Sequence, residues 1–546
     1  MPFLMSLKEK AENFSFKNFC INYKYTLICF LYLFVINWIL IEHFRMKSIL
    51  NIICLLLIVN ALAKTKFKFA LIFNVLLIIS LCIDGYFAFV YSELMSPAIA
   101  ASIIETNTNE AISMLKGIIP IATVIIAFTI FIIYKTEKEL KKSIIPRWLS
   151  LSIAGIFFLI ILPISIYGRV KKDINRDDFH NSAGIPSIIH SYISSRMPLV
   201  FSNWGALLLY YYEIKAMKDY SNGERLLPNG LILSDNNDSI PSKIFIIIGE
   251  SSYRGNYSLY GYNRKTTPFL DSLSSIPNSN LSYAKGISAA PITRDAIPLA
   301  LSFATSKNKK PFYEEMNAVE LAKNAGYQTI WISVQETIRM NENYVSHIAS
   351  TADTSEYKLN LGVKDLDLIP IINKYLEPEK KQCFFIHTNG SHEHYKDRVT
   401  SEDINYISGN SITDQYDQSI YHTDRFFREV NNISLKNEPS AIFYFSDHGE
   451  IIGKAHGFVH GGLEQYEVPI FIINNNSTLR TDSIIERFTN KETLLANTTN
   501  SIYIIAQLLG YQISNRTIEQ CIIDGDYVFH SDGKARTPKE VEDMKK

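Results

Sequence analysis

The sequence predicts a helical membrane anchor followed by an α/β domain with a mostly parallel, doubly wound sheet. Five apolar runs fall in the first third of the 546 residues, whereas short β-rich runs alternate with helical segments further along. Lys and Arg number 54, as do Asp and Glu, so the charge balance gives no argument for a nucleic-acid partner. We expect three parts: an anchor of five helices (1–168), bridging helices (169–225) and the α/β domain (226–546).

The anchor is predicted because most of the apolar runs approach the roughly 20 residues that cross a bilayer core. Basic residues gather in the tail before the first run and in the loops 64–68 and 135–147, whereas the loop 91–116 carries three Glu and one Lys. Because basic loops stay in the cytoplasm, the N-terminus is expected there, and five spans place the α/β domain on the opposite side. The five runs lie at residues 25–41, 49–63, 69–90, 117–134 and 148–167.

The segment 169–225 mixes basic side chains with aromatic and aliphatic ones. This mixture is typical of helices that lie in the plane of a membrane surface. Such helices would hold the α/β domain against the membrane, or they would pack on that domain instead. The sequence leaves both alternatives open.

Two of the predicted strands end in side chains that bind metal ions. The run 243–248 is followed by Gly249 and Glu250, and the run 441–446 by Asp447 and His448. In a parallel sheet, functional residues gather beyond the carboxyl ends of the strands. Glu, Asp and His together suit zinc or a similar divalent ion, so we predict a metal site at this edge. The five predicted strands are 243–248, 328–333, 383–387, 441–446 and 468–473.

Histidines are concentrated in the loops that follow two of these strands. Six of the twelve histidines lie there, which strengthens the prediction of a metal site. The pattern leaves open whether two of them, His394 and His456, take part. The six are His387, His392, His394, His448, His456 and His460.

A hydroxyl nucleophile is expected near the same edge. Thr293 follows a turn of small residues that could lead into a helix, and a helix N-terminus stabilises phosphate. A Thr at such a place is also a common helix cap, so its position alone does not decide whether Thr293 is a nucleophile or a cap. Ser251 and Ser252 could cap the next helix, and Ser446 should point away from the face that carries Asp447.

Taken in order, these motifs resemble the bacterial phosphoethanolamine transferases, inner-membrane members of the alkaline phosphatase and sulfatase superfamily. The resemblance extends over essentially the whole chain. It implies an alkaline-phosphatase-like catalytic domain in the periplasm, attached to a multi-pass anchor in the bacterial inner membrane. The matching pieces are Gly249-Glu250-Ser251-Ser252, Thr293 five residues before Pro298, His387 with His392, and Ser446-Asp447-His448-Gly449-Glu450 with His460 twelve residues after His448.

The resemblance also implies roles for single residues. Thr293 would be the nucleophile and would hold zinc together with Glu250, Asp447 and His448. The substrate site would contain His387, His392 and His460, of which the last two would handle the phosphoryl group or bind a second zinc.

The implied reaction moves phosphoethanolamine from phosphatidylethanolamine to lipopolysaccharide through a covalent threonine intermediate. Members that act on lipid A often carry cysteines where this chain has Ala289 and Leu299. In this respect the chain looks more like the branch of the family that acts on lipopolysaccharide core sugars, and the acceptor stays open between lipid A and a core sugar. Only two of the six cysteines, Cys383 and Cys521, lie in the α/β domain, and whether they pair stays open as well.

Three other functions were weighed. A sulfatase would need Cys or Ser where this chain has Ala289, two residues before Pro291. A glycerol-phosphate transferase or polymerase of the same superfamily would share the membrane anchor and the Thr nucleophile, and would differ in its product. A catalytically silent membrane sensor would be favoured by the loss of a metal ligand, but Glu250, Asp447 and His448 are all present.

Overall fold

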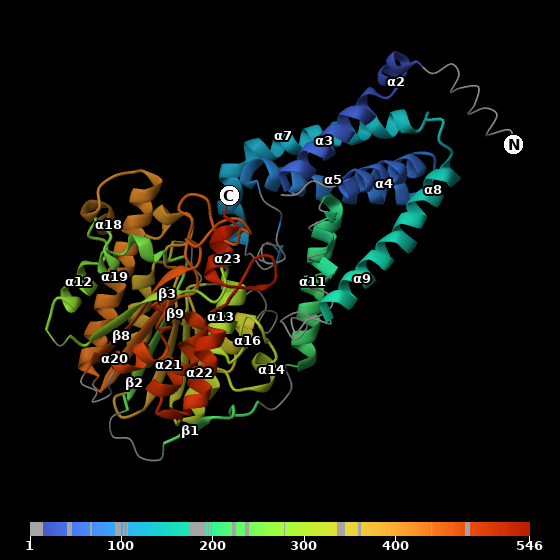
Figure 1. Cartoon of the computed structure of the whole chain (residues 1–546). Helices are drawn as coiled ribbons and strands as arrows, with labels where there is room; N and C mark the ends of the chain where they lie inside the picture. The colour runs from blue at the N-terminus through green and yellow to red at the C-terminus, as the bar shows by residue number, and fades with distance from the viewer. Residues whose placement is uncertain are drawn as a thin grey trace. The chain divides into compact units, whose positions relative to one another are not determined.

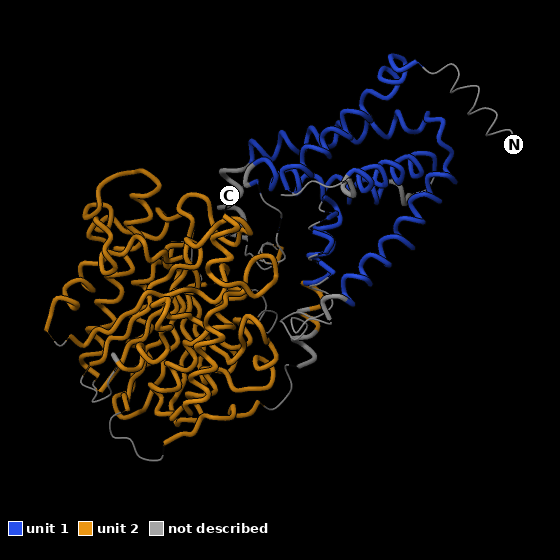
Figure 2. Tube along the Cα trace, viewed as in Figure 1, with its two compact units in different colours: residues 1–95, 114–179, 185–209 blue, residues 96–113, 180–184, 210–546 orange. Residues whose placement is uncertain are grey.

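The computed structural model contains two compact units, and each is described by itself (Figure 2). The first comprises residues 1–95, 114–179 and 185–209, and the second comprises residues 96–113, 180–184 and 210–546. The structure describes residues 15–40, 46–65, 68–92, 95, 100–101, 104, 108–174, 189–190, 192–194, 196–197, 199–220, 225–234, 240–277, 279–335, 344–358, 362–437, 439–475 and 481–545.

The first unit is helical, and its helices coincide with the five apolar runs (Figure 1). Two of them continue through a short π-helical stretch, η1 (Phe87–Tyr91) after α5 and η2 (Phe157–Ile161) after α8. The helices are α2 (Phe16–Asn22), α3 (Lys24–Leu40), α4 (Met46–Ala63), α5 (Lys68–Tyr86), α7 (Thr108–Leu140), α8 (Arg147–Ile156) and α9 (Leu162–Ile174). The first turns of α7, up to residue 113, and the end of α11 (Leu199–Tyr220), from residue 210 on, are assigned to the second unit.

Three of the described helices are long and apolar enough to cross a membrane, namely Leu71–Phe89, Ile119–Leu140 and Arg147–Lys171. The pair α2 and α3, bent by 79°, would make a fourth span, and Ile49–Ala63 is a shorter apolar helix. The helical membrane region is therefore confirmed with three to four spans by length and composition. The number five stays a prediction, as do the domain bounds at 168 and 225.

The second unit is built on an eight-stranded sheet in the order β5-β4-β6-β2-β7-β8-β3-β9. All five predicted strands are present, and β3, β5 and β9 are added to them. Only β8 runs antiparallel to its neighbours, so the sheet is mostly parallel as predicted. The strands are β2 (Lys243–Gly249), β3 (Leu281–Ile287), β4 (Gln328–Ser333), β5 (Thr354–Tyr357), β6 (Gln382–His387), β7 (Ser440–Ser446), β8 (Glu467–Asn475) and β9 (Leu495–Asn497).

Helices cover both faces of this sheet, which makes it doubly wound (Figure 1). Alternate residues of β2 enter different cores: Ile246 packs with one helical layer and Phe245 with the other. One layer contains α13 (Thr293–Leu301), α15 (Ala318–Asn324), α16 (Tyr344–Ala349) and α21 (Ser501–Leu508), and the other contains α12 (Pro268–Ser274), α17 (Ile369–Tyr375) and α19 (Ile412–Lys436).

The register of the central strands sets the position of the site. Ile248 of β2 lies opposite His387 of β6, and Gly249 lies opposite Ser446 of β7. The residues that follow these strand ends, Glu250 and Asp447 among them, therefore emerge at one edge of the sheet. Elsewhere in the same unit Cys383 and Cys521 are both free, so the pairing that the sequence left open is not formed.

Candidate metal-dependent active site

Glu250, Asp447 and His448 converge at the carboxyl ends of β2 and β7. Their ligand atoms all lie within 4.8 Å of one another, and all three residues are buried. Two hydrogen bonds join the loops that carry them: Asp447 N donates to the backbone oxygen of Gly249 over 3.0 Å, and Ser251 N donates to the side-chain oxygen Oδ1 of Asp447 over 3.2 Å. The predicted ligand set is thus brought together in space.

The electrostatics of this group favour a bound cation. His448 Nε2 lies 3.1 Å from Glu250 Oε1 and 3.3 Å from Asp447 Oδ2, while its Nδ1–H donates to Gly449 O over 2.9 Å. Burial lowers the pKa of His448, but the charges of Asp447 and Glu250 outweigh burial and raise that pKa to about 10. Burial and the charge of Glu250 raise the pKa of Asp447 well above its usual range.

A divalent ion fits this donor set. Asp447 Oδ2 is buried and accepts no hydrogen bond from any residue that the structure describes. A buried carboxylate oxygen in that state needs a compensating positive charge, because leaving it unsatisfied is costly. Two carboxylates and one imidazole nitrogen, turned toward one another, are donors that zinc prefers. Glu250, Asp447 and His448 would therefore hold the metal.

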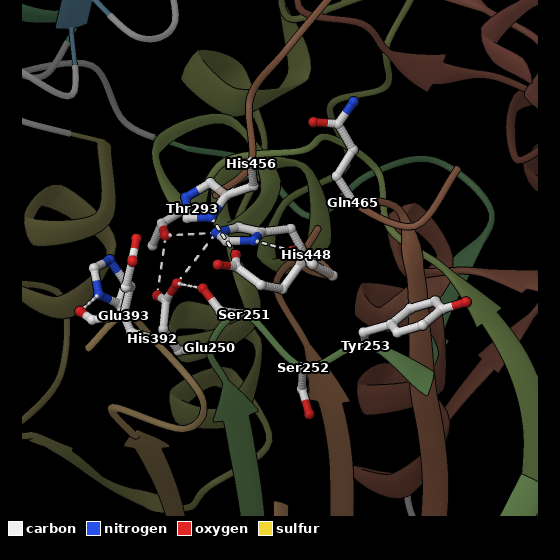
Figure 3. A network of polar contacts seen from close by, with 12 residues as sticks. Glu250, Ser251, Ser252, Tyr253, Thr293, His392, Glu393, His448, His456 and Gln465 are labelled. Atoms are coloured by element: carbon white, nitrogen blue, oxygen red, sulfur yellow. Dashed lines mark hydrogen bonds and ion pairs between the residues drawn. The ribbon is translucent and has the colours of Figure 1, made fainter. Parts of the chain in front are cut away.

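Thr293 lies directly beside this group (Figure 3). It is the first residue of α13, and its hydroxyl donates to Glu250 Oε2 over 3.0 Å. The hydroxyl oxygen of Thr293 also lies 3.2 Å from His448 Nε2. Because the first amides of a helix point outward and carry partial positive charge, this position also favours an anionic group next to the hydroxyl. The structure places Thr293 with the predicted ligands.

Gln335 supports Glu250 and was missed in the sequence. Its Nε2 donates to Glu250 Oε2 over 2.9 Å and to Thr388 O over 2.8 Å. Gln335 lies just after the end of β4, at the same edge of the sheet, and this position after a predicted strand could have marked it as a site residue. Because an uncharged amide neither titrates nor commonly binds metal ions, the sequence alone does not distinguish Gln335 from an ordinary loop residue.

Gly390 allows the loop after β6 to approach Glu250 closely. Ser391 N donates to Glu250 O over 2.9 Å, and a Cβ on Gly390 would overlap that carbonyl and lie 2.9 Å from Glu250 N. The φ of Gly390 is +48°, in the left-handed region that favours glycine. The loop that carries His392 and His394 is therefore held against the backbone of Glu250, a candidate metal ligand.

His387 and His392 lie on this loop or at its start. His387 ends β6 and is 3% exposed, and its Nε2 has no hydrogen-bond partner among the described residues. Burial lowers the pKa of His387 to about 4, although the charge of Glu250 opposes this shift. His392 Nδ1–H donates to Glu393 O over 2.8 Å. Their roles in substrate binding stay predictions.

His456, whose part the sequence left open, packs against His448, one of the three candidate metal ligands (Figure 3). Its ring centroid lies 3.9 Å from that of His448 and 6.0 Å from that of His392. Its Nδ1 lies 2.7 Å from Glu450 Oε2, and Tyr395 donates to the other oxygen of Glu450 over 2.8 Å. Burial raises the pKa of Glu450 to about 7. His456 therefore belongs to the site.

The remaining candidates make the following contacts. His460 Nδ1–H donates to Met544 O over 2.8 Å, and its catalytic role stays a prediction. Ser251 donates to Glu250 Oε1 over 2.9 Å, whereas the Ser252 hydroxyl lies 2.6 Å from Tyr257 OH. Neither serine caps a helix in the structure, in contrast to the alternative weighed from the sequence.

Three comparisons bear on the family. The family model for sulfatases matches residues 242–511. Phosphoethanolamine transferase EptC of Escherichia coli (strain K12) is 26% identical over 389 residues, a match that covers 66% of this chain and 65% of that protein. Phosphoethanolamine transferase CptA of Salmonella typhimurium is 26% identical over 386 residues, with the same coverage of 66% and 65%. The match thus spans just under two thirds of the length of these relatives.

A solved structure has the same overall fold. The integral membrane protein lipooligosaccharide phosphoethanolamine transferase A (EptA) from Neisseria meningitidis aligns with a TM-score of 0.64 at 16% identity, covering 90% of this chain and 96% of that one. The predicted fold, a helical membrane region plus an alkaline-phosphatase-like domain, is confirmed, whereas the location of that domain in the periplasm stays a prediction. Residues 242–511 belong to the sulfatase family, and the chain is similar to the phosphoethanolamine transferases EptC and CptA.

Proposed function

We propose that this protein transfers phosphoethanolamine from phosphatidylethanolamine to lipopolysaccharide through a covalent intermediate on Thr293. The main support is the placement of the Thr293 hydroxyl, 3.0 Å from Glu250 Oε2 and 3.2 Å from His448 Nε2, at the N-terminus of α13. A hydroxyl held between metal-binding groups at a helix N-terminus is suited to attack a phosphate ester. The similarity to EptC and CptA, both named as phosphoethanolamine transferases, supports the choice of the transferred group.

The first step forms a bond between Thr293 Oγ1 and phosphorus and breaks the bond to diacylglycerol. The hydrogen bond to Glu250 orients the hydroxyl and points its proton toward a carboxylate. Zinc held by Glu250, Asp447 and His448 would lower the pKa of the hydroxyl and offset the charge of the phosphate. Diacylglycerol leaves after its oxygen takes up a proton.

In the second step an acceptor oxygen displaces Thr293 from phosphorus. His392 and His460 are proposed to stabilise the transferred group or to exchange protons with the leaving and attacking oxygens, and His387 is proposed to line the substrate site. The acceptor is a lipid A phosphate or a core sugar. The donor is a lipid, so a membrane anchor raises its concentration near the site.

Hydrolysis of sulfate esters is not proposed, despite the name of the family. A sulfatase requires a Cys or Ser that is oxidised, and the matching position here is Ala289, which has no group to oxidise. Thr293 instead offers a hydroxyl that can form a stable phosphoester. The reaction class that these residues support is therefore phosphoryl-group transfer.

The decisive experiment compares the lipid A and the core oligosaccharide of cells with wild-type protein, with Thr293→Ala and without the protein. Mass spectrometry should show one added phosphoethanolamine on a single moiety, present only with the wild type. A glycerol-phosphate increment would support the superfamily alternative. Identical spectra in all three strains would contradict the proposal and favour a silent sensor.

A further inference from the structure

Residues 528–545 lie against the loops of the active site, although they follow the part of the chain that the sulfatase model matches. They form the hairpin of β11 (Val528–Phe529) with β12 (Ala535–Arg536) and the helix α23 (Pro538–Asp543). We call this stretch the carboxyl-terminal clamp.

The local sequence encodes α23. Thr537 and Glu540 form a capping box, in which Glu540 N donates to Thr537 Oγ1 over 3.3 Å and Thr537 N donates to Glu540 Oε2 over 2.8 Å. Pro538 occupies the first turn, where no amide proton is needed. Val541 is fully buried in a small cluster with Tyr466, which anchors the helix to the domain.

The clamp holds the loop 456–464 that carries His456 and His460. Leu463 N donates to Glu542 Oε2 over 3.2 Å, and Lys545 Nζ donates to Glu464 Oε1 over 2.8 Å. Both contacts are partly exposed, so each contributes little to global stability. Their effect is to fix the path of the loop.

The hairpin of the clamp joins this loop to the turn before the nucleophile. Phe529 N donates to Ala289 O over 2.6 Å, four residues before Thr293. The next residue, His530, is buried, and its Nε2 lies 3.1 Å from Val459 O. One short segment thus contacts both the loop 456–464 and the turn that precedes Thr293.

The most direct contact is made by Met544. Its carbonyl lies at the end of α23, where the last carbonyls of a helix lack partners within that helix, and it accepts from His460 Nδ1 over 2.8 Å. This hydrogen bond requires the proton on Nδ1, so in the neutral ring it selects the tautomer in which Nε2 carries no proton. Such a bond also fixes the orientation of the ring.

We propose that the carboxyl-terminal clamp is a positioning element of the active site. It holds the loop 456–464 and, through the Met544 carbonyl, sets the orientation and tautomer of His460. The catalytic part of this inference rests on the proposed function, because the role of His460 comes from there. The holding of the loop does not depend on that function.

The first test measures hydrogen–deuterium exchange of the loop 456–464 in the full-length protein. Glu542→Ala combined with Lys545→Ala removes both side-chain contacts. Lys539→Ala combined with Asp543→Ala is the matched control, since it removes the same charges from exposed positions on the same helix. The loop should exchange several-fold faster in the clamp variant only. Equal exchange in both variants would overturn the proposal.

The second test measures transfer from phosphatidylethanolamine in detergent micelles. The clamp variant should lower kcat by about 10-fold, with KM and zinc content unchanged. In a His460→Ala background the same two substitutions should have no further effect, because they act through that ring. An unchanged kcat would overturn the proposal, and so would an additional 10-fold loss in the His460→Ala background, which would indicate general destabilisation.

The two tests separate this inference from the proposed function. If the wild-type protein transfers nothing from phosphatidylethanolamine, the proposed function fails together with the catalytic part of the inference. The exchange measurement then still decides whether the clamp holds the loop.

Discussion

The Thr293 hydroxyl donates to Glu250 Oε2 over 3.0 Å, although 43 positions separate the two residues in the chain. Glu250 is in turn bound by Gln335 and lies 3.1 Å from His448. The Thr293 hydroxyl therefore contacts a carboxylate that Gln335 and His448 also hold in place. This relationship joins the proposed nucleophile to the metal site and is the basis of the first prediction.

Thr293→Ala should reduce transfer by about 10³-fold or more while the zinc content and the melting temperature stay close to wild type, since only one partly buried hydroxyl is lost. Incubation of the wild type with phosphatidylethanolamine and no acceptor should add the mass of one phosphoethanolamine to the peptide that contains Thr293. Peptide mass spectrometry checks this outcome.

The serines near Glu250 provide the controls for that prediction. Ser252→Ala and Ser251→Ala should retain substantial activity, because they remove hydrogen bonds to Tyr257 and Glu250 but no nucleophile. A modified peptide that contains Ser251 or Ser252 would show that the nucleophile is misassigned, and so would near wild-type transfer by Thr293→Ala.

Asp447→Ala should remove zinc together with activity. Asp447 supplies a buried carboxylate to a cluster of three donors, and two donors hold a divalent ion poorly. Elemental analysis of the purified variant checks this, with Asp543→Ala, an exposed acid on α23, as the control. Full zinc occupancy without activity would place the metal elsewhere.

Zinc affinity should rise with pH between about pH 6 and pH 9. Without metal, the charges of Asp447 and Glu250 overcome burial and raise the pKa of His448 to about 10, and the pKa of Asp447 is raised as well. A ligand must lose its proton to bind zinc, so zinc competes with protons across this range. Calorimetry in buffers of different ionisation enthalpy should show proton release on zinc binding. An affinity that does not change with pH would contradict these shifts.

Gly390→Ala should weaken zinc binding more than Gly362→Ala. Both glycines have positive φ, of +48° and +79°, so both alanines carry backbone strain of about 1–2 kcal/mol. Only at Gly390 does the new Cβ meet Glu250, whereas nothing lies within 4 Å at Gly362. Zinc titration of the two variants isolates the effect on Glu250, and equal affinities would show that the loop is not needed there.

A reporter fused after Lys142 should behave as cytoplasmic and one fused at the C-terminus as periplasmic. The expectation follows from the basic loops and from an odd number of spans, of which the structure supports three to four by length and composition. Paired alkaline phosphatase and green fluorescent protein fusions at each position measure it. A C-terminal fusion that is active only in the cytoplasm would contradict both the topology and the use of a lipid donor.

Local sequence alone was enough to predict the class of fold and the three residues, Glu250, Asp447 and His448, that the structure brings together as a group able to hold a metal. Two buried strands that end in Glu250 and in Asp447-His448 carry their ligands with them, because a parallel sheet brings its carboxyl ends to one edge whatever the loops do. The cap of α23 is equally local, since Thr537 and Glu540 lie within one turn. Such features depend on residues that are close in the chain, so they can be recognised without a structure.

The supporting contacts were decided only by the tertiary structure. The ring of His456 packs on His448, Gln335 binds Glu250, and Met544 meets His460, which lies 84 positions earlier in the chain. None of these residues carries a local pattern that marks its partner. These contacts depend on how whole loops pack over the edge of the sheet. Such packing is a property of the folded chain rather than of any short segment.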